Sequence, residues 1–361
     1  MARLTLEKIK KIYGKTVAAD IPYLEIKDKE FFGLLGPSGC GKTTTLRIIA
    51  GLTKPDEGRV LLDGKDITNV PPEKRNMAMV FQSWALFPHM TVYDNVAFGL
   101  RLRKVPENEI RKKVKWALEL LRLEGLENRY PHQLSGGQQQ RVAVARAIVI
   151  EPQVLLFDEP LSNLDAKLRE NVRFELRKLQ KRLGITSIYV THDQAEAFAI
   201  CDRIAIMNKG KIIQLGTPEE IYNKPVNLFV ASFVGVTYFI EGRLTEILDP
   251  SIGKVLISTE DGLEILAYAD LERVKKDQKV TLVVRPEYVH VASESNVENV
   301  FLAKVDRATY TGDGIDYEVK IGKWPIRLKT STTYKFEPGS EIKVHLDPMK
   351  IIVLPEILSS E

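Results

Sequence analysis

The sequence predicts an α/β domain followed by an all-β domain. From Leu34 to Gln214, short apolar runs alternate with stretches of helical spacing, the pattern of a mostly parallel sheet covered by helices. After about Phe239 the pattern changes to short runs of β-branched residues separated by Asp, Gly and Pro turns. The 361 residues are enough for two domains of roughly 150 residues each.

The composition is that of an ordinary soluble globular protein, with 44% hydrophobic and 28% charged residues. The formal net charge of +4 is too small to indicate nucleic acid as a partner. The two cysteines, Cys40 and Cys201, can build neither a disulfide framework nor a zinc knuckle. Charges interrupt the first fifteen residues and polar residues interrupt the uncharged stretch 76–93, so we expect neither a signal peptide nor a membrane span.

Changes in residue pattern divide the chain into segments. We expect the α/β domain to occupy residues 1–235 and to contain a helical insert at about 83–134, because 106–123 carries apolar residues at helical spacing. Residues 218–235 are expected to hold two linking helices. The many short strands of 236–361 favour a small barrel, of which the five-stranded oligonucleotide- or oligosaccharide-binding (OB) type is one example.

A glycine-rich loop follows the first apolar run. Gly36–Thr43 reads GPSGCGKT, directly after FFGLL and directly before a stretch of helical spacing. Such a loop turns backbone N–H groups toward phosphate oxygens, the following helix adds its positive end, and Lys42 reaches the outer phosphates. The Thr43 hydroxyl would bind Mg²⁺. A glycine turn that ends in Lys-Thr by chance is the alternative, but the flanking elements disfavour it. The predicted nucleotide-binding residues of the loop are Gly36, Ser38, Gly39, Cys40, Gly41, Lys42, Thr43 and Thr44.

A second apolar run, VLLF, ends in Asp158 and Glu159. A carboxylate at the end of a buried strand can hold the Mg²⁺ of a phosphate site, and we assign this role to Asp158. Strand alternation turns Glu159 the other way, toward the γ-phosphate, where it could orient or deprotonate an attacking water. The alternative is a solvated acidic pair that caps the strand.

Two further motifs complete a known order. Leu134–Gln138 reads LSGGQ and Thr191–Asp193 reads THD. The order GPSGCGKT, LSGGQ, VLLFDEP, THD resembles the nucleotide-binding subunit of ATP-binding cassette (ABC) transporters over residues 1–235. The resemblance implies a P-loop NTPase cassette of the ABC type with a helical subdomain, followed by an OB-like regulatory domain. In physical terms the serine and glycines of LSGGQ open a helix whose free N–H groups form a second anion site.

The resemblance also implies an ATP hydrolase that works as a head-to-tail homodimer, or as a dimer with a close paralogue. In such a dimer the signature residues Ser135, Gly136, Gly137 and Gln138 cover the ATP bound by the other chain. Tyr13 would stack on adenine, and Asp165 would link the two sites. The implied catalytic residues are Glu159, His192 and Gln82, and the implied Mg²⁺ ligands are Thr43, Gln82 and Asp158. Taken singly, Tyr13 could pack in a strand, His192 could end one, and Gln82 could be a surface amide.

Partners follow from the same resemblance. The chain would bind integral membrane permease subunits at the cytoplasmic face of the cell membrane and would serve an extracellular solute-binding protein indirectly. The apolar run Trp84–Met90 is either local core or a groove for a permease helix.

The tail, with VVRPEYV at Val283–Val289, resembles that of the importer ATPases for maltose and other oligosaccharides, with polyamine or ferric-iron importers as the alternative.

Other protein classes fit the sequence less well. A nucleic-acid-handling cassette would need a coiled-coil insertion or a second cassette, and a small-molecule kinase has no use for LSGGQ. A non-catalytic scaffold is disfavoured because Glu159 and His192 are both present.

Overall fold

The computed structural model describes residues 2–295 and 298–356, and it divides into two compact units, 1–218 and 219–361. The division lies before the boundary at 235 that the sequence suggested. Two helices do occur where linking helices were predicted, α7 (Pro218–Asn223) and α8 (Leu228–Phe233). α8 belongs to the second unit because its buried Ala231 joins a small apolar cluster with side chains of that unit.

A six-stranded sheet forms the centre of the first unit, in the order β10-β9-β3-β8-β7-β6. Its neighbouring strands are parallel except for the antiparallel pair of β9 and β10. This confirms the mostly parallel sheet predicted from the alternation of apolar runs and helical stretches. In chain order the strands are β3 (Phe31–Leu35), β6 (Met77–Val80), β7 (Val154–Asp158), β8 (Thr186–Thr191), β9 (Arg203–Asn208) and β10 (Lys211–Gly216).

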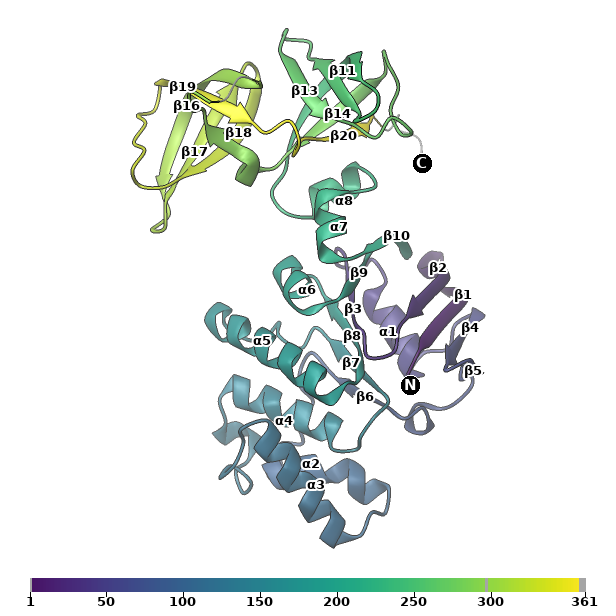
Figure 1. Ribbon diagram of the computed structural model, residues 1–361. Coiled ribbons are helices and arrows are strands. Elements are labelled where there is room, and N and C mark those ends of the chain that lie inside the picture. Colours follow the sequence, from purple (N-terminus) through teal and green to yellow (C-terminus); the bar gives the residue numbers. More distant parts are fainter. Residues whose placement is uncertain (1, 296–297, 357–361) are drawn as a thin grey trace. The chain divides into compact units, whose positions relative to one another are not determined.

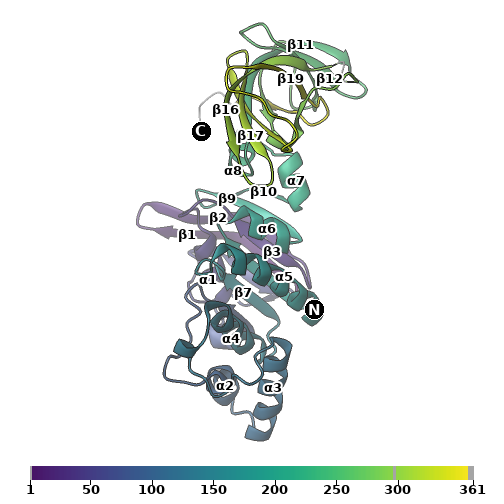
Figure 2. The ribbon, with the colours of Figure 1, turned by 90° about the vertical axis from the view of Figure 1, so that its left-hand side faces the viewer.

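Helices cover both faces of this sheet, with α1 on one side and α5 and α6 on the other (Figures 1 and 2). Successive strand side chains point to opposite faces, so Phe32 joins the cluster that includes α1, whereas Phe31 stacks with Phe157 at 6.0 Å. The guanidinium of Arg177 in α5 lies 5.8 Å from the Phe31 ring. These helices span Lys42–Ala50 (α1), Ala166–Leu183 (α5) and Gln194–Ile200 (α6).

An antiparallel sheet of order β2-β1-β4-β5 lies in the same unit and was not predicted. Its inward side chains, such as Leu6 and Ile21, belong to the same apolar cluster as α1 and β3. A short 3₁₀ helix, η1 (Pro72–Lys74), precedes β6. The strands are β1 (Leu4–Tyr13), β2 (Thr16–Ile26), β4 (Glu57–Leu62) and β5 (Lys65–Asp66).

The segment predicted as a helical insert contains two α-helices and a short 3₁₀ helix, and a third α-helix follows it. The predicted spacing is confirmed in α3, whose Ile110, Val114 and Leu118 are buried. Figure 1 shows α2, α3 and α4 gathered at one end of the first unit. The elements are α2 (Val92–Leu102), α3 (Glu107–Leu120), η2 (Pro131–Gln133) and α4 (Gly136–Ile148).

In its described residues, 219–295 and 298–356, the second unit is all β apart from α7, α8 and the short helix η3 (Pro286–Tyr288), as the sequence pattern predicted. It contains two five-stranded antiparallel sheets around one shared core, to which β14 contributes Leu282 and β19 contributes Val344. The first sheet, in spatial order, is β13 (Glu264–Tyr268), β12 (Lys254–Ser258), β11 (Tyr238–Asp249), β14 (Lys279–Val284) and β20 (Ile352–Pro355). The second is β15 (Val289–Val291), β19 (Glu341–Leu346), β16 (Val300–Tyr310), β17 (Ile315–Ile321) and β18 (Trp324–Thr330).

Candidate nucleotide site

The parallel strands bring the sequence motifs to one edge of the sheet. Residues 36–41 follow the carboxyl end of β3, and Gln82 lies two residues beyond β6. Glu159 and His192 directly follow β7 and β8. β3 pairs with β8, β8 with β7 and β7 with β6, all in parallel, so these loops emerge side by side. Ligands of open α/β sheets bind in the crevice at this edge.

The loop 36–41 depends on two glycines for its shape. Gly41 has φ +104° and caps α1, and a Cβ there would lie 2.1 Å from the carbonyl oxygen of Ala18. A Cβ on Gly36 would lie 2.3 Å from the carbonyl oxygen of Met207. No side chain fits at either position without moving backbone. The packing of neighbouring strands therefore holds the loop closely against the sheet.

Lys42 folds back over this loop. Its ammonium donates to the carbonyl oxygens of Gly36 (2.8 Å) and Pro37 (3.0 Å), and the residue is only 5% exposed. The positive charge is thereby held against the loop that we predict to bind phosphate. The neighbouring Cys40 is buried, and burial raises the pKa of its thiol, so Cys40 fills space as a neutral group.

Thr43 and Asp158 meet although they lie far apart in the sequence. The Thr43 hydroxyl donates to Asp158 Oδ1 at 3.1 Å. Burial raises the pKa of the Asp158 carboxyl, and the hydrogen bond from Thr43 and the charge of Arg47 partly oppose that rise. An adjacent hydroxyl and carboxylate suit Mg²⁺, which binds through one or two carboxylates together with water and phosphate oxygens. No group of three or more His, Cys, Asp or Glu side chains suited to a metal occurs among residues 2–295 and 298–356.

Glu159 and His192 lie in direct polar contact at this edge. His192 Nδ1 lies 3.0 Å from Glu159 Oε2, and the two side chains are 56% and 20% exposed, respectively. Glu159 has φ +45°, a left-handed conformation that is uncommon for any residue except glycine. β7 therefore ends at Asp158, and this turn directs Glu159 instead of the strand alternation that the sequence argument used.

Tyr13 and Gln82 are both open to solvent. Tyr13 ends β1 with 52% of its surface exposed, and the Lys11 ammonium lies 5.4 Å from its ring centre. The main-chain carbonyl of Gln82 accepts a hydrogen bond from the Asn163 side chain at 2.9 Å. Each side chain is available to a ligand, as the sequence argument requires.

The LSGGQ segment begins α4 with a capping box. The Ser135 hydroxyl accepts from the N–H of Gln138, and the Gln138 side chain accepts from the N–H of Ser135. A Cβ on Gly136 or Gly137 would approach Leu164 or Leu168 to 3.3 Å or 3.1 Å, respectively. The two glycines thus allow the signature helix to pack closely against the segment that begins α5.

Asp165 caps α5, with its Oδ1 accepting from the N–H of Leu168 at 2.9 Å.

In the Trp84–Met90 segment, the indole N–H of Trp84 donates to the carbonyl oxygen of Pro160, and the Phe87 ring lies 4.6 Å from that of Phe98. Part of this apolar run is therefore local packing.

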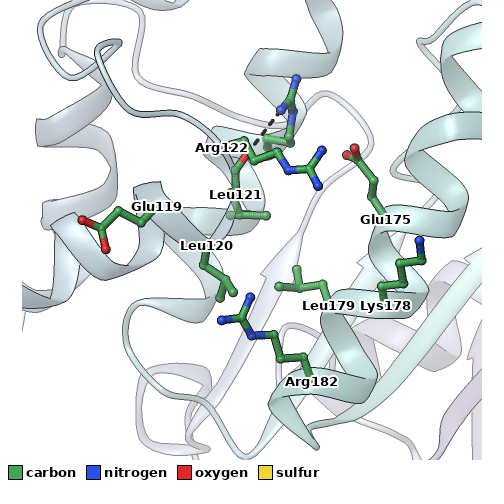
Figure 3. A pocket seen from close by; sticks show the side chains of 9 residues that line it. Glu119, Leu120, Leu121, Arg122, Glu175, Lys178, Leu179 and Arg182 are labelled. Atoms are coloured by element: carbon green, nitrogen blue, oxygen red, sulfur yellow. Dashed lines mark hydrogen bonds between the residues drawn. The ribbon is translucent and has the colours of Figure 1, made fainter.

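Clefts in the first unit lie both at and away from these motifs. Figure 3 shows one of about 290 Å³ between the end of α3, α4 and α5, where Arg141 donates to the Leu121 carbonyl. None of the predicted site residues lines it. A much smaller cleft, of about 30 Å³, is lined by Glu159, Ser162, Arg169, Thr191, His192, Asp193 and Glu196. Arg169 and Glu196 are not among the residues predicted from the sequence, although Arg169 lies one helical turn beyond Asp165.

Comparison with known proteins identifies the family. The profile of the ABC transporter family matches residues 21–162, and that of the TOBE domain matches 282–354. A spermidine/putrescine import ATP-binding protein (PotA) of Acetivibrio thermocellus is 44% identical over 355 residues, 98% of this chain and 97% of the relative. This chain belongs to the ABC transporter family.

Other relatives of the ABC ATPase carry the same name. The PotA proteins of Haemophilus influenzae (strain KW20) and Thermotoga maritima are 46% and 48% identical, over 91% and 82% of this chain and 88% and 81% of their own. The dimeric structure of the bacterial ABC transporter cassette MJ0796 matches with a TM-score of 0.54 and 35% identity, over 60% of this chain and 98% of that one. A post-hydrolysis state of the same cassette, bound to ADP and Pi, matches with a TM-score of 0.53 and 35% identity, over the same shares of the two chains.

These comparisons confirm the predicted fold, an ABC-type P-loop cassette followed by a TOBE domain. They also confirm an ATP-binding, ATP-hydrolysing ABC transporter ATPase. The relatives are not named as sugar importers, which the wording of the motifs had favoured, and their names agree instead with the polyamine alternative. Within the described residues, no helix is long and apolar enough to cross a bilayer.

Proposed function

We propose that this chain is the ATPase subunit of an importer for polyamines of the spermidine and putrescine type. The supporting observation is that relatives with this name match both the cassette and the β-rich unit, at 44% identity over 98% of the chain in one case. Sugar import has no such support among these relatives. We also propose that the chain lies at the cytoplasmic face of the membrane, bound to permease subunits. An extracellular solute-binding protein would deliver the solute to those subunits.

We assign the ATP site to the edge of the six-stranded sheet. The loop 36–44 and Lys42 bind the phosphates, and Tyr13 stacks on the adenine. Thr43, Asp158 and Gln82 would hold Mg²⁺, which supplies positive charge to the phosphate oxygens as the bond breaks. The 3.1 Å hydrogen bond between Thr43 and Asp158 supports this set, because it brings two of the three ligands together.

Glu159 is the proposed general base for the attacking water. Its carboxylate lies 3.0 Å from His192 Nδ1, so the imidazole fixes the position of that carboxylate and leaves Nε2 for a γ-phosphate oxygen. A positioned acid–base group contributes a factor of about 10² to 10⁴ in rate.

The active form is proposed to be a head-to-tail dimer. Ser135, Gly136, Gly137 and Gln138 would cover the ATP of the other chain, and Asp165 would link the two sites. The N–H groups that begin α4 support this assignment, since a helix N-terminus attracts phosphate. The dimeric structure of the MJ0796 cassette, a relative in fold and sequence, is consistent with such pairing.

Uptake by cells tests the proposed function. The gene is deleted, and import of labelled spermidine, putrescine and maltose is measured with the wild-type chain or with Glu159→Gln restored. Only polyamine uptake should be lost on deletion, and only the wild-type chain should restore it. Loss of maltose uptake with intact polyamine uptake would overturn the proposal.

A further inference from the structure

Arg169 links two segments that reach the catalytic edge from different helices. It lies in the first turn of α5, where its Nη2 donates to the carbonyl oxygen of Leu164 at 2.9 Å. Its Nη1 lies 3.5 Å from Asp193 Oδ2, and its Nε lies 3.8 Å from Glu196 Oε1. One guanidinium therefore contacts the turn before α5 and two carboxylates at the start of α6.

The two carboxylates hold the turn that carries His192. Asp193 caps α6, with its Oδ1 accepting from the N–H of Glu196 at 3.2 Å. Glu196 Oε2 accepts from the hydroxyls of Thr191 (2.8 Å) and Tyr189 (2.9 Å), and the Thr191 hydroxyl accepts from the N–H of Asp193. Residues on both sides of His192 thus belong to one hydrogen-bonded network, to which Arg169 adds the positive charge.

The positive charge of Arg169 lies beside a buried carboxyl group, that of Glu196. The Glu196 side chain is 4% exposed, and burial raises the pKa of its carboxyl while the Thr191 and Tyr189 hydroxyls and Arg169 oppose the rise. The Nε–H of Arg169 is buried and makes no hydrogen bond within the described chain. Charge attraction to both carboxylates and one hydrogen bond to Leu164 therefore hold the guanidinium. A planar fork can make such contacts on several sides at once, which a lysine ammonium cannot do equally well.

The turn before α5 connects further to the nucleotide site. The Ser162 hydroxyl donates to the carbonyl oxygen of Glu159 at 3.0 Å, and the Leu164 side chain lies against Gly136 of the signature helix α4, 3.3 Å from where a Cβ of Gly136 would be. A displacement of the signature helix would therefore reach the carbonyl that Arg169 binds. Arg169 in turn contacts Asp193 and Glu196, which hold the His192 turn.

We propose that Arg169 is a positioning residue that couples the turn before α5, Ser162–Asp165, to the His192 turn, so that a movement of the first turn aligns His192 for hydrolysis. The proposal rests on the assignment of Glu159 and His192 to ATP hydrolysis. It adds a role for an arginine that does not touch the reacting atoms. Its removal should lower kcat and leave ATP binding unchanged, because neither the loop 36–44 nor Tyr13 contacts it.

The test compares Arg169→Gln and Arg169→Lys with Lys178→Gln in the full-length protein. Lys178 is exposed on the same helix, and its side chain makes no hydrogen bond or ion pair within the described residues, so its substitution controls for loss of charge. We expect Arg169→Gln to lower kcat by on the order of 10-fold to 10²-fold, since small misplacements of catalytic groups have effects of this size. KM and the ATP affinity measured by calorimetry should stay within about twofold of wild type, Arg169→Lys should recover part of kcat, and Lys178→Gln should match wild type.

A double-mutant cycle separates positioning from general stability. If Arg169 acts through His192, Arg169→Gln should slow hydrolysis no further in a His192→Ala background. If Arg169→Gln does not fold, Asp193→Asn interrupts the other end of the link and should give the same loss of kcat at unchanged KM.

Three outcomes would overturn the proposal. The first is a kcat within twofold of wild type for Arg169→Gln. The second is a double mutant whose loss of kcat equals the product of the losses in Arg169→Gln and His192→Ala. The third is an Arg169→Gln variant in which KM changes and kcat does not. Wild-type hydrolysis by both Glu159→Gln and His192→Ala would instead refute the catalytic assignment itself, and the role of Arg169 with it.

Discussion

The Glu159 carboxylate and the His192 imidazole lie 3.0 Å apart, and the backbone conformation of Glu159 makes that contact possible. A non-glycine residue in the left-handed region costs on the order of 1 kcal/mol or more, and such residues gather at functional sites. Asp158, the residue before it, stays in the strand and meets Thr43. Two consecutive carboxylates thereby contact different partners, Thr43 and His192.

Glu159→Gln should slow ATP hydrolysis by on the order of 10² or more while ATP binding persists, because an amide cannot accept the proton of the attacking water. Phosphate release and calorimetry measure the two effects. Glu175→Gln is the matched control, since it removes an exposed carboxylate on α5. Unchanged turnover in Glu159→Gln would remove this residue from the mechanism.

Glu196→Gln should stabilise the protein at pH 8 and lose that advantage on acidification. Burial raises the folded-state pKa of Glu196, so the ionised carboxyl costs stability above that pKa and costs nothing below the unfolded value of about 4.3. The difference in unfolding free energy should therefore shrink as the pH falls through the folded pKa. Urea titrations across this range measure it, with Glu170→Gln as an exposed control. A difference that widens in acid would show that the hydrogen bonds and Arg169 outweigh burial.

Among the elements, the strand-to-helix loops hold the residues of the proposed site, and tight backbone packing shapes the loop after β3. The loop after β3 passes so close to neighbouring backbone that only glycine fits at Gly41, whereas Gly39 has φ +77° with open space around its Cβ position. Substitutions at Gly41 and Gly39 can therefore distinguish the effect of a steric clash from the effect of the backbone conformation within one loop.

Gly41→Ala should weaken ATP binding more than Gly39→Ala. Both substitutions place alanine at positive φ, at a cost of roughly 1 kcal/mol, but only the first also drives a methyl group into the Ala18 carbonyl at 2.1 Å. We expect ATP affinity to fall by about 10-fold or more in Gly41→Ala, an effect equal to about 1.4 kcal/mol. Calorimetry and thermal unfolding of both variants measure this. Equal losses would mean that backbone conformation alone limits the loop.

On the scale of the whole molecule, each unit has its own core. The first core combines strands of both sheets with α1, and the second is shared by the two five-stranded sheets. α8 belongs with the second unit because Val234 at its C-terminal end is fully buried and its carbonyl accepts a hydrogen bond from Arg285. A boundary after residue 235, as expected from the sequence, would place Val234 and Arg285 in different units.

A chain ending at residue 217 should stay more soluble than one ending at 235 and should hydrolyse ATP within a few-fold of the full chain per folded molecule. The longer fragment would expose Ala231 and Val234, which are buried in the intact protein. Light scattering and phosphate release on both fragments test this. A folded but inactive 1–217 fragment would show that the β-rich unit is needed for catalysis.

Local signals in the sequence are enough to predict several elements and motifs. Apolar spacing was enough to predict α3, and the order of strand, glycine loop and helix was enough to predict the loop 36–41. Parallel strands also place their carboxyl ends together, so the meeting of Thr43 with Asp158 could be anticipated.

Tertiary structure alone decided the contacts that depend on how whole elements pack. The direction of Glu159 follows from a left-handed turn, which strand alternation does not encode. Arg169 reaches Asp193 because α5 and α6 pack against each other. Likewise, the boundary near 218 depends on which unit buries α8. Periodicity shows which face of an element is buried, whereas the partner of that face is set by side chains distant in the sequence.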